Sequence, residues 1–366
     1  MKVVICGAGV IGASLAYFLV QRGVDVTIID RCGVAVAASG KSGGFLALDW
    51  CDGSPMQQLA RNSFELHAEL ATSFDQAYDY RRLDTYLVEG TEHNSLVPSR
   101  QGNPKWLNGN CAVRYALGTS TTTAQVHPEK FTRALVDAAI ARGATLQIGC
   151  IEGISLSGTP STVRSIVVDG TPTSADAAVI AMGPWSNTAS KWLPLPPVGG
   201  AKSQSITLHP IDGIPAHALF VDYRTEAGEQ HAPEIFARPD GEVYICGMSD
   251  DTPVPESADQ VAPNLPACDA LHKMAANLSS SLANAKRTRN QACYRPICID
   301  GLPLLGQIPG VNGAFVATGH NCWGILNAPA SGLAMTELIV DGHAKTIDLS
   351  PFEPMRLMHH MPVVGS

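Results

Sequence analysis

Residues 2–30, KVVICGAGVIGASLAYFLVQRGVDVTIID, determine the fold of the first part of the chain. KVVIC is a short apolar run typical of a buried strand, and the helical spacing that follows ends near Arg22, where Gly23 can close a helix. VDVTIID then predicts a second strand that ends at Asp30. This order of strand, glycine-rich turn, helix and strand predicts a parallel βαβ unit.

The turn of this unit has three glycines in the spacing G-x-G-x-x-G. Gly7 permits the tight turn, Gly9 lets the backbone approach a pyrophosphate, and Gly12 lets the helix pack closely against the strand. Val10 and Ile11 begin the helix, whose free N–H groups and positive dipole end attract phosphates. We therefore predict a dinucleotide-binding unit of the Rossmann type. The alternative is a plain βαβ unit rich in small residues.

Asp30 and Arg31 follow the second strand directly. An acidic group at this distance from the glycines can bind the ribose hydroxyls of a dinucleotide. Because this residue is acidic rather than basic, a 2′-phosphate on that ribose is disfavoured. The unit alone does not distinguish NAD from FAD.

The composition excludes several classes of protein. The 366 residues are 45% hydrophobic and 16% charged, which is typical of a packed globular chain, and the formal net charge of -8 disfavours a nucleic-acid binder. The ten cysteines form no C-x-x-C pair and no zinc-like grouping with histidine, so we expect no metal site. No apolar run reaches the length of a membrane span. Scattered thiols and the lack of a visible targeting signal predict a protein of the cytoplasm or of a reducing organelle lumen.

The segment AASGKSGG, residues 37–44, permits several interpretations. Its Gly-Lys-Ser resembles the end of a Walker A loop, but that motif requires a glycine where Ala35 stands. The segment also matches G-x-S-x-G, which would make Ser42 the nucleophile of a serine hydrolase; such an elbow, however, precedes a helix, and FLALDW after this loop reads as a strand. Our preferred hypothesis is a small-residue loop in which Ser39, Lys41 and Ser42 close over phosphates and the edge of a flat cofactor. An ordinary mobile Gly/Ser loop is the remaining alternative.

Helical and strand patterns alternate at both ends of the chain and enclose a middle that is rich in strands. Residues 129–142 read as a helix, ADAAVIAMGPWSN contains a buried parallel strand, and residues 203–250 read as short antiparallel strands. We predict an α/β chain, α+β overall, in which a Rossmann-type domain contains an inserted, mainly antiparallel β domain. The predicted division assigns residues 1–80, 120–200 and 292–366 to the cofactor domain and residues 81–119 and 201–291 to the substrate domain.

Seven stretches of the chain are similar, in the same order, to those of one known family. They are GAGVIGASLA, IIDR, AASGKSGG, the helix opened by His127-Pro128, AMGPWS, RPICIDGLPLLG and GHNCWGI with its helix. Through them the chain resembles the FAD-dependent D-amino-acid, glycine and sarcosine oxidase family along nearly its full length. The resemblance implies FAD rather than NAD as the cofactor.

The resemblance also implies where the cofactor lies. The loop from Ser39 to Gly43, with Lys41 and Ser42, would lie along the cofactor, and Ile151 would offer backbone contacts to the adenine. A helix that starts near Gly324 would direct its positive end toward the flavin N1/C2 carbonyl. The other implied residues line the channel (Gly183, Trp185) or the flavin ring (Gly319, His320, Gly324, Ile325).

Arg295 and Cys293 lie in ACYRPICIDG, residues 292–301. In glycine and D-amino-acid oxidases the arginine of this Arg-Pro pair binds the substrate carboxylate, so the resemblance implies that role for Arg295; a guanidinium can fork both oxygens and stays charged. The alternative is a structural arginine paired with Asp300. In the sarcosine-oxidase branch a cysteine at the spacing of Cys293 bonds covalently to the flavin, and the alternative for Cys293 is a small buried hydrophobe.

One position departs from the family pattern. The sarcosine-oxidase branch has a lysine, thought to assist oxygen, two residues before a strand glycine, and VYICGMS has Ile245 there. The departure places rapid use of O₂ in doubt. Lys202 is a candidate substitute, although a solvated or phosphate-pairing Lys202 is the preferred expectation.

The resemblance implies an FAD-dependent oxidoreductase that oxidises the C–N bond of a small amine or amino acid. Arg295 would hold the carboxylate while hydride passes to flavin N5, and O₂ or another acceptor would reoxidise the flavin. The alternatives are an FAD dehydrogenase of a hydroxy acid or modified amine, and a flavin-binding protein without turnover.

Overall fold

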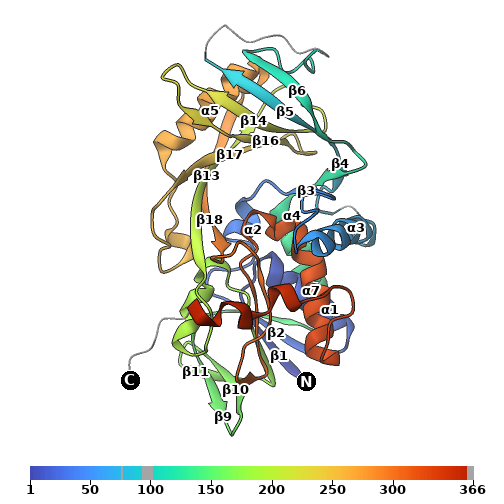
Figure 1. The fold of residues 1–366 in the computed structure, drawn as a ribbon, viewed down its shortest axis with the longest axis vertical. Coiled ribbons are helices and arrows are strands. Elements are labelled where there is room, and N and C mark those ends of the chain that lie inside the picture. The colour runs from blue at the N-terminus through green and yellow to red at the C-terminus, as the bar shows by residue number, and fades with distance from the viewer. Residues whose placement is uncertain (76, 93–101, 361–366) are drawn as a thin grey trace.

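The predicted βαβ unit forms the centre of one half of the molecule, the lower half in Figure 1. This computed structural model describes residues 1–75, 77–92 and 102–360. The strands that precede and follow α1 (Val10–Gln21) in the sequence, β1 (Lys2–Cys6) and β2 (Asp25–Asp30), pair directly with each other in parallel. They belong to a six-stranded sheet of order β19-β21-β12-β1-β2-β8, parallel except for β19 at its edge. The remaining strands of this sheet are β8 (Thr145–Ile148), β12 (Ala177–Ile180), β19 (Leu304–Gln307) and β21 (Ala314–Thr318).

Alternate residues of β1 face two different layers. Val3 and Ile5 pack in a core with the helices α1, α3, α4 and α7, whereas Val4 and Cys6 pack in a core with a smaller sheet. The central sheet is therefore covered on both faces, which explains its near-continuous apolar strands. The helices are α3 (Gln57–Ser73), α4 (Pro128–Ile140) and α7 (Gly324–Asp341), and the smaller sheet contains β9 (Ile151–Ser157), β10 (Ser161–Val168), β11 (Thr171–Ser174) and β20 (Val311–Asn312).

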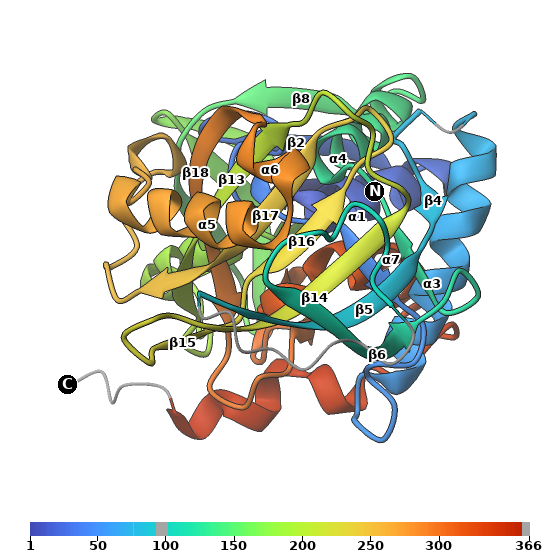
Figure 2. The ribbon, with the colours of Figure 1, turned by 90° about the horizontal axis from the view of Figure 1, so that it is seen from above.

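An eight-stranded, mostly antiparallel sheet forms the other half of the molecule (Figure 1). Its order is β18-β13-β17-β16-β14-β5-β6, with β15 paired to β14, and only the β14–β5 pair of this sheet is parallel among the described residues. α5 (Leu265–Leu278) and α6 (Ser280–Ala283) lie across one face of it, as Figure 2 shows. The strands are β5 (Asp84–Thr91), β6 (Cys111–Gly118), β13 (Gly199–His209), β14 (His217–Arg224), β15 (Gln230–His231), β16 (Glu234–Ala237), β17 (Val243–Asp250) and β18 (Lys286–Ile297).

The two faces of this sheet have different neighbours. Ile235 of β16 and Ile245 of β17 are fully buried in the core formed with α5. Phe236 and Tyr244, one position away, belong to a separate cluster with Phe45. We call this second face, opposite α5, the inner face.

Short elements connect the two halves. A three-stranded sheet, β3-β7-β4, lies where the chain passes between them, and β13 and β18 extend from the large sheet into the lower half (Figure 1). The short elements of this region are α2 (Ala38–Lys41), β3 (Phe45–Ala47), β4 (Arg81–Arg82) and β7 (Thr123–Gln125). The 3₁₀ turns of the described chain are η1 (Gly183–Lys191), η2 (Ala258–Gln260), η3 (Asn321–Trp323), η4 (Ser350–Phe352) and η5 (Pro354–His360).

The predicted fold class, a Rossmann-type domain with a mainly antiparallel β insertion, is confirmed. The predicted domain division stays a proposal: its boundary at residue 292 falls inside β18, and residues 93–101 and 361–366 of the predicted ranges lie outside the described residues. Within the described ranges, no helix is both long and apolar enough for a membrane span.

Candidate cofactor and substrate site

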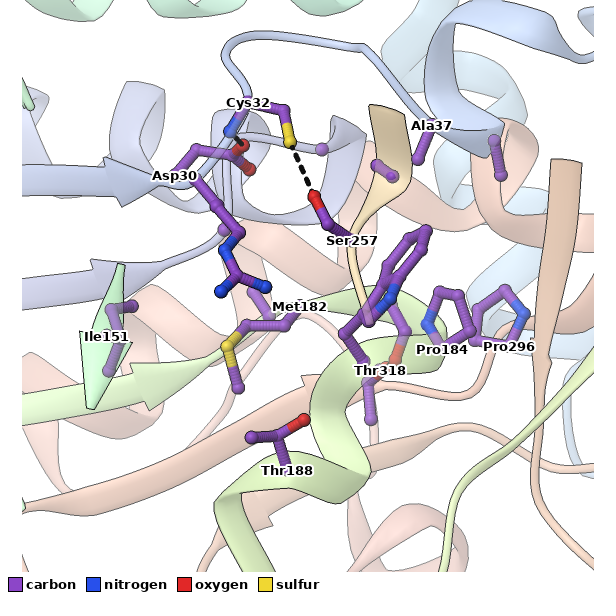
Figure 3. Close-up of a pocket in the computed structure, with 18 of the residues that line it drawn as sticks. Asp30, Cys32, Ala37, Ile151, Met182, Pro184, Thr188, Ser257, Pro296 and Thr318 are labelled. Atoms are coloured by element: carbon purple, nitrogen blue, oxygen red, sulfur yellow. Dashed lines mark hydrogen bonds between the residues drawn. The ribbon is translucent and has the colours of Figure 1, made fainter. Parts of the chain in front are cut away.

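A cavity of about 760 Å³ lies beside the turn between β1 and α1 (Figure 3). One end is lined by Asp30 and Ile151, and the other extends to Pro296, Thr318 and His320. Segments far apart in the sequence form its walls: the glycine turn, the loop after β2, the start of β9, η1, the start of β13 and residues 254–258. We call residues 254–258 the strap.

The glycines of the turn have the contacts that their spacing predicts. Gly7 has φ +117°, and an added Cβ would collide with the carbonyl oxygen of Ala181. At Gly12 the same addition would collide with the oxygen of Gly7, so the helix and the turn pack backbone against backbone. Gly9 lines the cavity, where an added Cβ would lie 3.1 Å from Ser39 Oγ. These positions leave a backbone wall that a phosphate can approach.

The carboxylate of Asp30 is engaged mainly by the protein itself. Its Oδ2 accepts the N–H of Ala8 at 2.8 Å, and its Oδ1 accepts the N–H groups of Cys32 and Gly33 at 2.8 and 2.9 Å. Asp30 therefore ties the glycine turn to the loop after β2, where Figure 3 shows it beside Cys32. The predicted contact between Asp30 and ribose hydroxyls stays a prediction. Oδ2 accepts one hydrogen bond and Oδ1 accepts two, so Oδ2 has more capacity left for a hydroxyl.

Ser39 also supports the glycine turn. Its Oγ accepts the N–H of Val10 at 2.9 Å, which satisfies one of the unpaired donors at the start of α1. Because Gly9 and Ser39 both line the cavity, the loop of residues 37–44 begins beside the predicted pyrophosphate site.

The strap was not predicted from the sequence. Trp185 Nε1 donates to the oxygen of Pro255 at 2.8 Å, and Arg31 pairs with Glu256 at 3.0 Å. Cys32 Sγ lies 3.3 Å from Ser257 Oγ, the contact drawn dashed in Figure 3. The strap follows β17 and is brought to the cavity only by the tertiary fold, so no local pattern marks it.

The predicted cofactor residues divide into two groups by position. The residues that line the cavity are Gly7, Gly9, Val10, Ile11, Asp30, Arg31, Ser39, Ile151, Gly183, Trp185 and His320. The residues that do not line it are Gly12, Lys41, Ser42, Gly43, Gly319, Gly324 and Ile325. Lining residues that the sequence did not indicate include Cys32, Met182, Thr188 and Lys191.

Gly183 offers a direct test of whether a cofactor fits. It has φ +55°, and an added Cβ would meet no atom within 4 Å among the described residues. The space beside it belongs to the cavity, which continues from the glycine turn to His320. An elongated site with a backbone wall beside a helix N-terminus fits a dinucleotide.

His320 is a neutral residue in this site. Burial lowers the pKa of its imidazole to about 3, and its Nε2 lies 3.0 Å from Ser331 Oγ. Its Nδ1 is buried without a hydrogen-bond partner in the described parts of the chain. A group with so low a pKa is a weak base, and the predicted place of His320 beside the flavin ring stays a prediction.

The loop of residues 41–44 packs against the inner face. An added Cβ on Gly43 would collide with the ring of Phe236, Tyr244 OH donates to the oxygen of Lys41 at 3.0 Å, and Arg238 donates to the oxygen of Ser42. The hydroxyl of Ser42 is buried and bonds to no described residue, so no base activates it. α2 precedes Ser42 and β3 follows it, the reverse of a nucleophile elbow. The geometry therefore gives no support to a serine hydrolase.

Arg295 projects from β18 toward the turn that precedes α7. Its Nη1 donates to Asn321 Oδ1 at 3.1 Å, and its Nε is buried without a partner among residues 1–75, 77–92 and 102–360. The alternative partner, Asp300, is bound instead by Arg356, with Nε to Oδ2 at 2.7 Å. Pairing of Arg295 with Asp300 is therefore wrong. Asn321 directly follows His320, so Arg295 is connected to the far end of the cavity by adjacent residues.

Cys293 is buried on β18, and burial raises the pKa of its thiol to about 11. Lys41 and Arg295 act in the opposite direction but do not overcome burial. A thiolate, which a covalent flavin link requires, is thereby disfavoured. The link itself stays a prediction.

Two expectations about lysine need correction. Ile245 lies in the core with α5 rather than on the inner face, so the inward positions of β17 are Tyr244 and Cys246. Lys202 is neither solvated nor beside the cavity. It is buried, with its Nζ 3.3 Å from Asp250 Oδ2 and 3.4 Å from Thr252 Oγ1.

Aromatic rings cover much of the inner face. Phe45 lies 5.1 Å from Trp50, 5.2 Å from Phe220 and 5.5 Å from Phe236, measured between ring centroids. Trp50 also lies 6.4 Å from Trp323 of η3. These residues come from four separate segments, which explains why the sequence did not reveal the group. Across the described residues there is no group of three or more His, Cys, Asp or Glu that could hold a metal ion.

Comparisons with known proteins identify the family. Residues 2–338 match the model of the family described as FAD dependent oxidoreductase. The chain is 30% identical to a protein of Schizosaccharomyces pombe named only as an oxidoreductase, over 96% of this chain and 97% of that protein. It is 27% identical to glycine oxidase of Geobacillus kaustophilus, over 99% and 98% of the two chains. The crystal structure of glycine oxidase from Geobacillus kaustophilus has the same fold, with a TM-score of 0.78, 23% identity and coverage of 97% and 99%. The chain belongs to the FAD-dependent oxidoreductases of the D-amino-acid oxidase family, and its cofactor is FAD.

Proposed function

We propose that this oxidoreductase oxidises the C–N bond of a small amine or amino acid whose carboxylate is bound by Arg295. The observation behind the proposal is the state of that guanidinium. Its Nε is buried and unpaired within the described residues, while Asp300, the acid closest to it in sequence, is bound to Arg356. A cation held in this way is suited to an anion that arrives with the substrate.

The edge of the guanidinium that carries Nε and Nη2 is the part best suited to a carboxylate. Nη1 is occupied by Asn321 Oδ1, which holds the group in one orientation. A fork of two parallel N–H groups fixes both the position and the direction of a bound carboxylate. The rest of the substrate is then fixed relative to the site, and this orientation is a main source of rate acceleration.

FAD, when bound, supplies the two-electron acceptor for the oxidation. The protein contributes the anion site at Arg295, the aromatic surface around Phe45 that excludes water, and a cavity that holds the cofactor. The substrate amine must be neutral when it is oxidised, because an ammonium has no lone pair to form the C=N bond. Hydrolysis of the imine would release the keto or aldehyde product.

The name of one relative supports an amino-acid substrate. Glycine oxidase of Geobacillus kaustophilus, which this chain matches along nearly its full length, is named for an amino acid. The electron acceptor is O₂ or another oxidant. The inward positions of β17 are occupied by Tyr244 and Cys246 rather than by a lysine, which favours slow use of O₂.

An anaerobic panel tests the proposal. The holoenzyme is mixed with small amines, amino acids of both configurations and hydroxy acids, and loss of the yellow flavin absorbance is followed. We expect bleaching by at least one amino acid. Bleaching by hydroxy acids alone would replace the proposal with a hydroxy-acid dehydrogenase, and no bleaching by any compound would leave a flavin-binding protein without this activity.

The attachment of the cofactor needs a separate test. Because burial keeps Cys293 protonated, we propose that FAD is bound without a covalent link. Acid precipitation of the holoenzyme should leave free flavin in the supernatant. Yellow colour that stays in the protein pellet would mean that Cys293 is linked after all, and Cys293→Ala should then release it.

A further inference from the structure

Glu234 is an acidic side chain on the inner face, at the start of β16. It lies opposite Phe220 of β14 and Cys246 of β17. Cys246 Sγ donates to its Oε2 at 3.5 Å, and in the described part of the chain no Lys, Arg or His forms a salt bridge with it. Burying an ionised carboxylate among aromatic rings and thiols costs on the order of several kcal/mol of folding free energy. A cation or further hydrogen-bond donors would offset this cost.

Arg295 is the cation that acts on this carboxylate. Burial raises the pKa of Glu234, whereas the thiol of Cys246 and the charge of Arg295 lower it in part. Glu234 and Arg295 nevertheless form no salt bridge with each other within the described residues. Two opposite charges therefore lie near one another on the inner face, each with hydrogen-bonding capacity that the protein does not use.

The surroundings of Glu234 suit a positively charged group. Phe220, its cross-strand neighbour, lies 4.8 Å from Trp50 and 5.2 Å from Phe45, measured between ring centroids. The faces of such rings attract cations when water is excluded. A ligand group that meets Glu234 here would gain from the carboxylate and from the rings together.

We propose that Glu234 binds the protonated amino group of the substrate while Arg295 binds its carboxylate, so that the substrate class is the zwitterionic amino acid. The inference rests on the proposed function, because it uses the carboxylate site at Arg295. Binding at two points fixes the carbon between the two groups. A carboxylate with a raised pKa also accepts the ammonium proton more readily than an ordinary one, so binding is compatible with the later loss of that proton.

Alanine and propionate provide the test, because they differ only in the amino group. Dissociation constants of both are measured with the holoenzyme, from the change in flavin absorbance and from the shift of the unfolding midpoint. Glu234→Gln keeps the shape of the side chain and removes its charge. Glu226→Gln removes the same charge from an exposed site between β14 and β15 and serves as the control.

In Glu234→Gln, alanine should bind about tenfold or more weakly, as expected for loss of a hydrogen bond to a charged group, while propionate should bind equally or more tightly. Glu234→Asp should restore part of the alanine affinity, and Glu226→Gln should change neither constant. Equal weakening of both ligands would mean that Glu234 only holds Arg295, and unchanged binding of both would mean that it has no role; either result overturns the inference. If the wild-type holoenzyme binds neither ligand, the carboxylate site itself fails, and the proposed function fails with it.

Discussion

The glycine-turn end of the predicted FAD cavity and the inner face of the large sheet differ in whether the protein satisfies their polar groups. At the glycine-turn end of the cavity the protein satisfies its own groups: Asp30 accepts three backbone N–H groups, and Ser39 accepts the N–H of Val10. On the inner face, Glu234 and Arg295 keep hydrogen-bonding capacity that no described residue uses. The glycine-turn end is therefore preorganised without a ligand, whereas in the function we propose the substrate supplies the missing partners of the inner face.

The largest expected effect comes from a substitution in the glycine turn of the predicted FAD cavity. Gly7→Ala places a Cβ against the oxygen of Ala181 at a φ of +117°, so the turn must move. We expect a loss of about 3 kcal/mol in the free energy of unfolding and purification with little FAD. Chemical denaturation and the flavin-to-protein absorbance ratio measure both.

Gly23→Ala is the matched control for this change. Gly23 also has a positive φ, +71°, but an added Cβ there meets nothing within 4 Å among the described residues. It should cost only about 1 kcal/mol and retain FAD. Equal losses in the two variants would show that the contact with Ala181 does not matter.

The next largest effect is expected from a substitution at the proposed carboxylate site. Arg295→Ala should raise KM for amino acids about 100-fold, because it removes a forked charge-assisted contact, and should leave KM for simple amines within a few-fold of the wild type. Steady-state kinetics with an amino acid and its decarboxylated amine measure the contrast.

Arg356→Ala separates this role from a structural one, since Arg356 is already paired with Asp300. It should lower the unfolding midpoint and leave the ratio of the two KM values unchanged. An equal rise of KM for both substrates in Arg295→Ala would assign Arg295 a structural role.

The pH dependence of the free energy of unfolding tests the state of His320, which lines the cavity. Burial holds the pKa of His320 at about 3, below the ordinary histidine value of about 6.5, so below about pH 6.5 the unfolded chain takes up a proton that the folded chain does not. Stability therefore falls as the pH falls from about 6.5 toward the folded pKa. Between pH 7 and about pH 5 this one group should cost about 2 kcal/mol.

His320→Asn should remove about that much from the difference in unfolding free energy between the two pH values. His343→Asn, at an exposed position, should leave the difference unchanged. If His320→Asn leaves the pH dependence as it was, His320 is not a buried neutral histidine.

The smallest effect concerns the strap. Trp185→Phe keeps an aromatic ring and removes the N–H that binds the oxygen of Pro255, which should speed FAD dissociation about three- to tenfold. Release can be followed by the rise in flavin fluorescence after dilution. Trp106→Phe removes a similar N–H, bound to His217 away from the cavity, and should not alter release. Equal rates in all three proteins would show that the strap does not retain the cofactor.

The same two regions differ in how far the sequence predicts them. The glycine turn of the cavity follows from local rules, because the spacing of Gly7, Gly9 and Gly12 and the position of Asp30 depend on one continuous segment. The inner face joins strands and loops from distant parts of the chain, and only alternation along each strand decides which side chains face inward. Ile245 shows the difficulty, because a shift of one position exchanges it with Tyr244 or Cys246.

Resemblance indicated Arg295 as the residue that binds the carboxylate, a role that stays a proposal, but gave no information on its protein partner. Asp300 is close to Arg295 in sequence, yet the turn after β18 directs it to Arg356 near the end of the described chain. Glu234 belongs to no motif, and it is the sheet register that places it opposite Phe220 and Cys246 on the inner face. The strap was missed for the same reason, since it lies more than two hundred residues after the loop it contacts.

The strap also bears on how fast the cofactor can dissociate. It follows directly from β17 of the large sheet, yet it is fastened to Arg31, Cys32 and Trp185 of the nucleotide-binding half. We expect a dinucleotide enclosed by these contacts to leave only when several of them open together. Dissociation of FAD would then be a first-order step whose rate constant depends on how often the strap opens, and not on the concentration of free FAD.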